Sequence, residues 1–183
     1  MGRLSENSTV VLKNKSHAVT AEIVVPDGNG SASGVIVAQG GAFGGWSLYA
    51  KDGKPAYCYN LFGLEQFKVY GDAPIPPGEH QVRMEFAYDG GGLGRGGTAK
   101  LYLDGSQVGE GRIDASVPML FSADETTYVG SDSGTPVSDD LGPRESIFNG
   151  RVRWVEFDLG EDAQDTDQLI TPEERFQIAM ARQ

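Results

Sequence analysis

An acidic, irregular segment at residues 124–140 holds the side chains best suited to bind a metal ion. Asp124, Asp132 and Asp139 are spread through it among serine, threonine and glycine residues. Carboxylate oxygens are the hard ligands that Ca²⁺ prefers, although the spacing differs from that of an EF-hand loop. Asp and Ser also form turns by bonding their own backbone. Two interpretations therefore stay open: a calcium site with these three ligands, or a set of ordinary turns.

A second candidate is the glycine-rich stretch at residues 90–97, which contains Gly92, Gly94, Arg95 and Gly96. Its letters fit the G-x-G-x-x-G pattern of dinucleotide sites, but that pattern must open a helix, whose N-terminus holds the pyrophosphate. A strand pattern follows here, so a dinucleotide site is rejected. The stretch is either a connection between two strands or a surface that meets a partner, where Arg95 could hold an anion.

Other residue types that carry catalysis are few in this chain. His17 and His80 each stand at the start of a predicted strand, and Cys58 is the one cysteine. Zinc sites need more His or Cys than this, and no Gly-x-Ser-x-Gly elbow supports a Ser-His-Asp triad. Cys58 lies in an apolar strand without a basic neighbour in sequence, which predicts a structural thiol. The chain is not predicted to be an enzyme by itself, and these patterns require no cofactor.

The composition of the 183 residues disfavours two classes of partner. The 15 Lys and Arg against 26 Asp and Glu give a net charge of −11, which repels the phosphate backbone of nucleic acids. No apolar run approaches the length of a membrane span. The first residues lack a signal-peptide pattern, and the location stays open between the cytoplasm and the periplasm.

Alternating apolar residues predict short strands along most of the chain. The runs cover residues 18–25, 34–39, 46–50, 56–61, 66–70, 81–88, 98–103, 107–113 and 150–159. In the last run the apolar phase changes, which predicts a β-bulge near Trp154 and Val155. The 26 glycines add many tight turns. We therefore predict an all-β fold of two packed antiparallel sheets.

The chain divides into three predicted parts. Residues 1–12, of which the first nine are polar and patternless, read as a linker, residues 13–160 form one sandwich domain, and residues 161–183 hold an acidic linker and a short C-terminal helix. That helix begins at the capping box Thr171-Pro172-Glu173-Glu174. It carries Phe176, Ala179 and Met180 at helical spacing. A helix this short must dock on its own sandwich, a neighbouring domain or another chain, and a homo-oligomer stays open.

Five motifs in order resemble the C-terminal region of bacterial arylsulfatases. They are Asn14-Lys15-Ser16-His17, residues 40–49, residues 86–94, Leu103-Asp104-Gly105 and residues 129–137. The hairpin at 101–105 and the last strand also resemble laminin-G-like and concanavalin-type jelly rolls. The resemblance implies a jelly-roll sandwich. It also implies a non-catalytic, accessory role beside a sulfatase catalytic domain, in cis or in trans.

The resemblance does not extend to sulfatase chemistry. The residues after Cys58 depart from the formylglycine motif Cys/Ser-x-Pro-x-Arg at both the Pro and the Arg. Two glycine loops are instead expected to face the catalytic domain or its sulfate-ester substrate, because glycine permits close backbone approach. The residues are Phe43, Gly44, Gly45 and Trp46 in the first loop, and Gly92, Gly94, Arg95 and Gly96 in the second.

A lectin-like carbohydrate-binding module, with or without Ca²⁺, is the alternative interpretation. Aromatic residues crowd one third of the chain, and aromatic side chains on sheets can stack on sugars or fill a core. The crowded residues are Trp46, Tyr49, Tyr57, Tyr59, Phe62 and Phe67. A glycoside hydrolase on this architecture is a remote third interpretation, because no paired-acid pattern is found.

Overall fold

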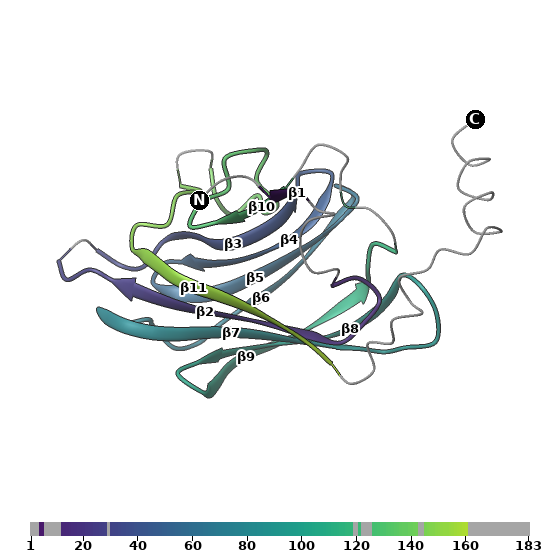
Figure 1. The fold of residues 1–183 in the computed structure, drawn as a ribbon, viewed down its shortest axis with the longest axis horizontal. Coiled ribbons are helices and arrows are strands. Elements are labelled where there is room, and N and C mark those ends of the chain that lie inside the picture. Colours follow the sequence, from purple (N-terminus) through teal and green to yellow (C-terminus); the bar gives the residue numbers. More distant parts are fainter. Residues whose placement is uncertain are drawn as a thin grey trace.

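The computed structural model describes residues 4–5, 12–28, 30–118, 121, 126–142 and 145–160. These residues form two antiparallel sheets that pack face to face (Figure 1). The predicted all-β sandwich is confirmed. The expected C-terminal helix at 161–183 lies outside the described residues, as do most of residues 1–12. No helix of membrane-spanning length and hydropathy occurs in the part of the chain that is described.

The first sheet has the strand order β1-β10-β3-β4-β5-β6. Its strands are β1 (Leu4–Ser5), β10 (Thr126–Val129), β3 (Gly34–Gly41), β4 (Gly44–Lys51), β5 (Lys54–Leu61) and β6 (Glu65–Tyr70). The second sheet has the order β11-β2-β7-β8-β9. Its strands are β11 (Arg151–Leu159), β2 (His17–Val25), β7 (Gly78–Tyr88), β8 (Arg95–Leu103) and β9 (Ser106–Ala115).

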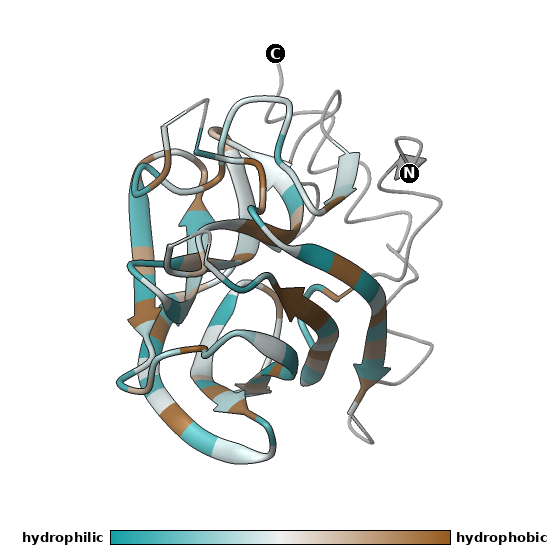
Figure 2. Cartoon of the chain, turned by 90° about the vertical axis from the view of Figure 1, so that its left-hand side faces the viewer, coloured by the Kyte–Doolittle hydropathy of each residue, from teal (hydrophilic) through white to brown (hydrophobic). Residues whose placement is uncertain are grey.

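The core lies between the two sheets and is built from their alternating apolar residues. Hydrophobic and hydrophilic positions alternate along several strands in Figure 2, as one buried and one outer face require. Val19, Ala21 and Ile23 of β2 are fully buried. The aromatic crowd belongs largely to this core, since Trp46 and Tyr57 stack at a ring distance of 6.5 Å. Core packing, rather than sugar stacking, therefore explains most of those aromatic residues.

The bulge expected in the last strand is present in β11. The pairing of β11 with β2 changes register between Val152 and Trp154. Val152 packs against the core, whereas Arg153 and Trp154 are both exposed. Two residues of β11 thus face outward opposite Glu22, which is the arrangement a β-bulge produces.

Residues 131–142 form a long irregular segment that covers the outer face of the first sheet. Val137 and Leu141 of this segment pack against Val35, Tyr49 and Cys58 of the sheet. They make a second, smaller apolar cluster outside the main core. This part of the acidic segment therefore packs on the outer face of the first sheet.

Candidate functional site

The outer face of the second sheet carries a row of four side chains, three from neighbouring strands and one from the turn after β8. Trp154 of β11 pairs with Glu22 of β2, and Glu22 pairs with Gln81 of β7. Asp104, at the end of β8, follows Gln81 in the row, because its backbone N–H donates to the Gln81 carbonyl at 2.9 Å. Residues paired directly across antiparallel strands point to the same face. The sheet register therefore brings an aromatic ring, an amide and two carboxylates together.

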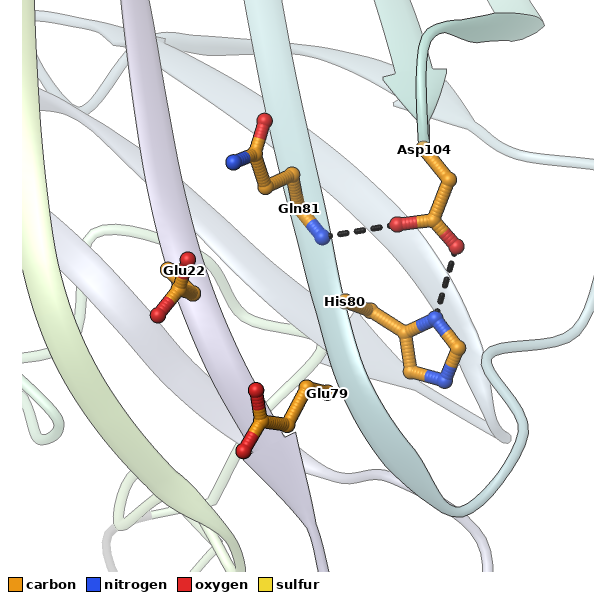
Figure 3. A pocket seen from close by; sticks show the side chains of 5 residues that line it. All are labelled: Glu22, Glu79, His80, Gln81 and Asp104. Carbon is orange, nitrogen blue, oxygen red and sulfur yellow. Dashed lines mark hydrogen bonds and ion pairs between the residues drawn. The ribbon is translucent and has the colours of Figure 1, made fainter.

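A pocket opens along this row, at the end of the sheet where β7 begins. Its lining consists of Glu22, Glu79, His80, Gln81 and Asp104, and its volume is about 330 Å³. Figure 3 shows these five side chains, which come from β2, β7 and the turn after β8. The lining is polar throughout. Such a site can make many hydrogen bonds to a ligand rich in hydroxyl groups.

Asp104 is held in place by two hydrogen bonds (Figure 3). Its Oδ1 accepts from the Gln81 backbone N–H at 2.8 Å, and its Oδ2 lies 2.7 Å from Nδ1 of His80. Partial burial raises the pKa of the Asp104 carboxyl, but the His80 and Gln81 bonds outweigh that effect and lower the pKa. The carboxylate therefore stays charged at neutral pH and fixes the orientation of the imidazole.

Arg153 places positive charge beside the two glutamates of the pocket. Its guanidinium lies 3.4 Å from Oε1 of Glu22 and also pairs with Glu79. Three carboxylates then face one guanidinium and the His80 ring. The pocket and its rim therefore carry a net negative charge.

The next row of the same face is already saturated with internal bonds. Arg83 donates to Thr20 and Asp158 at 2.8 Å each, and to Glu85 at 2.9 Å. An arginine engaged by three partners offers little to a ligand. The row of Trp154, Glu22, Gln81 and Asp104 is the better candidate, since Trp154 remains 38% exposed.

The first glycine loop is the turn between β3 and β4. Phe43 is 71% exposed at its tip. Gly44 and Gly45 are buried at the start of β4, and a Cβ atom built on Gly45 would lie 2.2 Å from the Gln39 carbonyl oxygen. Trp46 is 1% exposed and donates from Nε1 to Gln39 at 3.1 Å. Its indole belongs to the core and is not available to a partner.

The second glycine loop joins β7 to β8 and is ordered by two side chains. The Tyr88 hydroxyl donates to the Gly92 carbonyl at 2.5 Å, and the Gly94 N–H donates to Oδ1 of Asn14 at 2.8 Å. Gly92 and Arg95 are exposed, Gly94 is half-buried and Gly96 is buried. Of the eight residues predicted to face a partner, Phe43, Gly92 and Arg95 are therefore the exposed ones.

The predicted calcium ligands do not converge where the structure describes them. Asp132 is buried, and its Oδ2 accepts from the Val137 N–H at 3.1 Å, as in a turn. Asp139 is exposed and pairs with Lys68, while Asp124 lies outside the described residues. Across those residues, no three His, Cys, Asp or Glu side chains come together as a metal site requires. The calcium site remains a prediction.

Cys58 lies beneath residues 131–142 on the first sheet. It is fully buried, and burial raises the pKa of its thiol to about 12. The thiolate form, which would be the nucleophile, is therefore almost absent at neutral pH. Cys58 is a packing residue, as its apolar strand predicts.

No protein-family model matches the chain, and no curated protein matches it. Solved structures do share its fold. Domains LG4-5 of the mouse laminin alpha1 chain are similar with a TM-score of 0.57 and 16% identity, over 87% of this chain and 40% of that one. The CBM40 domain of the Ruminococcus gnavus IT-sialidase, bound to alpha2,3 sialyllactose, is similar with a TM-score of 0.52 and 13% identity. That match covers 86% of this chain and 81% of the other.

These likenesses establish architecture alone, because identities this low do not transfer a function. The chain spans less than half the length of the laminin chain that it matches. Within the described residues, the sandwich has the laminin-G-like jelly-roll fold.

Proposed function

We propose that this chain is a carbohydrate-binding module that holds a glycan on the outer face of the second sheet. The observation that supports it is the row of Trp154, Glu22, Gln81 and Asp104 beside the polar pocket. An exposed indole next to carboxylate groups and an amide suits a sugar, whose ring has apolar faces and whose rim has hydroxyl groups. A glycan bound to the similar CBM40 domain adds support by analogy of fold.

Each member of the row has a distinct part in the proposed complex. Trp154 stacks on the apolar face of one sugar ring. Glu22 and Asp104 accept hydrogen bonds from hydroxyl groups, and the Gln81 amide can both donate and accept. A volume of about 330 Å³ falls within the range of small-molecule sites.

The charge of the pocket sets the class of sugar that we expect. Glu22, Glu79 and Asp104 together exceed the single positive charge of Arg153. Like charges in a partly desolvated site repel. We therefore expect neutral glycans to bind more tightly than sialylated or sulfated ones.

Replacing Trp154 by alanine should weaken glycan binding at least tenfold. The variant loses the stacking interaction and the apolar area that binding would bury on the indole. The binding free energy should therefore weaken by about 1.4 kcal/mol or more, which is a factor of ten in the dissociation constant. The measurement is titration calorimetry of the purified chain against neutral, sialylated and sulfated glycans, with and without Ca²⁺. Ile147→Ala is the matched control, because Ile147 is 66% exposed but pairs with Val35 of the first sheet. Absence of binding by the unmodified chain at millimolar glycan would refute the proposal.

An accessory role beside a sulfatase catalytic domain is the second proposal. It rests on the resemblance and on the position of the two glycine loops at one end of the sandwich. A Cβ atom built on Gly44 would lie 3.1 Å from the Phe121 carbonyl oxygen, and one on Gly94 would lie 3.3 Å from that of Ser116. Both loops therefore flank the segment after β9 and could overhang one active site.

Shortening the second loop tests this role in a sulfatase that carries the domain. Deletion of Gly90 and Gly91 should lower kcat/KM for bulky sulfate esters while leaving small esters unaffected. Neither glycine has an atom near enough for a Cβ to contact, so the fold should tolerate the change. Equal kinetics toward both substrate sizes would count against an accessory role.

A further inference from the structure

Three exposed apolar side chains gather at the end of the sandwich opposite the polar pocket. Phe43 is 71% exposed, Phe62 47% and Leu64 87%. They lie on two adjacent turns, β3–β4 and β5–β6, because a Cβ atom on Gly63 would sit 2.8 Å from the Ala42 carbonyl oxygen. We call the surface that these three side chains form on the two turns the apolar turn pair. Clustered exposed apolar side chains mark an interaction surface more often than single ones do.

The fold holds this surface in one conformation through Asn60, which is 1% exposed. Its Nδ2 donates to the carbonyls of Ala42 at 3.2 Å and Val137 at 2.9 Å, and its Oδ1 accepts from the Gly63 N–H at 2.8 Å. One buried amide therefore ties both turns to the segment over the first sheet. Because the turns are preorganised, a docking partner loses little conformational entropy in ordering them.

Phe62 also has a strained backbone. Its φ is 55°, in the left-handed region that bulky residues seldom adopt. Such strain persists only where the surrounding structure enforces it, and it clusters at functional positions. Here the strained residue belongs to a turn that presents an apolar ring to solvent.

The described chain leaves the sandwich at this same end. The Gly160 N–H donates to the Ser16 carbonyl at 2.8 Å, and Phe157 meets Trp46 edge-on at 6.2 Å. Trp46 follows Phe43 by three residues. Residues 161–170 can span about 33 Å when extended, at roughly 3.3 Å per residue. The segment that follows them can therefore reach the apolar turn pair.

We propose that residues 171–183 of the same chain dock on the apolar turn pair. Their sequence predicts a short helix with Phe176, Ala179 and Met180 on one side, which is too short to be stable without a surface to pack on. A tethered segment has an effective concentration in the millimolar range, so a surface of three side chains suffices. The inference is independent of the glycan site, which lies on the second sheet at the other end of the sandwich.

Photo-crosslinking of the full chain tests the docking directly. Benzoylphenylalanine in place of Leu64 should crosslink within one chain to peptides from residues 171–183. The yield should be at least fivefold higher than from the same probe in place of Ile147, which is exposed beside Gly34 at the far end of β3. Phe176→Asp should reduce the Leu64 yield to the Ile147 level.

Each other outcome overturns the proposal. Crosslinks from Leu64 to a second copy would make the apolar turn pair a self-association surface. A Leu64 yield equal to that at Ile147, or no crosslink at either position, would show that the segment does not dock there. Both probe positions are exposed, and an unchanged melting temperature for each labelled chain confirms that the sandwich is intact.

Discussion

Gly40→Ala is expected to destabilise the fold by more than about 3 kcal/mol, because both the backbone and the space at this position exclude a side chain. Gly40 has φ 94°, and a Cβ atom there would lie 2.2 Å from the Gly44 carbonyl oxygen and 2.7 Å from the Gly45 Cα. These are backbone atoms of the paired strand, so they cannot rotate away. The β3–β4 hairpin would have to separate to admit a methyl group.

Gly92→Ala is the matched control for that substitution. Gly92 also has a positive φ, 123°, but no atom lies within 4 Å of a Cβ built on it. Its cost should be the backbone strain alone, about 1–2 kcal/mol. Urea unfolding of both variants measures the two free energies. Equal losses of unfolding free energy in the two variants would contradict this prediction. They would mean that the two strands separate at no cost and that the contacts around Gly40 do not exclude a side chain.

Asp140→Asn should cost about 2 kcal/mol of folding stability at neutral pH. The Asp140 carboxylate is 11% exposed and accepts from Tyr49 at 2.5 Å, from Lys68 at 2.7 Å and from Tyr70 at 2.8 Å. The neutral amide cannot form an ion pair with the Lys68 ammonium. Hydrogen bonds to charged groups contribute about 1.5–3 kcal/mol to stability. These bonds fasten residues 131–142 to the first sheet.

Asp139→Asn is the control here, since Asp139 pairs with the same Lys68 but its side chain is 75% exposed. An exposed ion pair of this kind contributes about 0–1 kcal/mol. The two neighbouring substitutions should therefore differ clearly in urea unfolding at pH 7. Similar small losses for both would show that residues 131–142 are held by their apolar contacts instead.

The Asp140 contribution should also depend on pH. Burial alone raises the pKa of this carboxyl, but the bonds from Lys68, Tyr49 and Tyr70 outweigh it and hold the pKa below its usual value. A lowered folded-state pKa gives stability that is present above the unfolded value, near 4, and is lost as the pH falls through the folded value. The stability difference between the unmodified chain and Asp140→Asn should stay constant from pH 8 to pH 5 and shrink below pH 4. A difference that grew in acid would contradict this assignment.

Sequence alone predicted the fold well because its signals are local. Alternation, tight turns at glycine and the phase change in the last strand each depend on a few neighbouring residues, and the sandwich and the bulge both occur. The burial of Cys58 follows in the same way from its strand. The arylsulfatase resemblance agrees with the jelly-roll architecture and otherwise remains a proposal.

The candidate site could not be predicted from the sequence in the same way. Glu22 and Gln81 are ordinary outward-facing residues of their strands, and Asp104 is an ordinary turn residue after β8. They lie beside Trp154 only because the register of the neighbouring strands aligns them, and that register is set by contacts between distant parts of the chain. The one local signal was the phase break at Trp154, which predicted a bulge and could also have indicated an outward-facing indole.

The glycines of the two loops are of different kinds. The sequence predicts these loops as a contact surface, and the structure buries Gly45 and Gly96. Cβ atoms on them would lie 2.2 Å from the Gln39 oxygen and 2.3 Å from the Ile113 oxygen, respectively. These two glycines let strands pair closely. A glycine required inside a sheet and one required at a partner surface look alike in a single sequence.

The bulge in β11 lets a jelly-roll sandwich present two adjacent side chains on one outer face. A regular strand alternates its faces, so it could place either Arg153 or Trp154 opposite Glu22 on the outside, but not both. One inserted codon supplies the second position, while Val152 and Val155 keep their contacts with the core. A cationic side chain and an aromatic side chain, here Arg153 and Trp154, can then stand together on the surface without a compensating change in the core. In protein engineering, the same single-residue insertion at an edge strand offers a route to graft a binding face onto other jelly rolls.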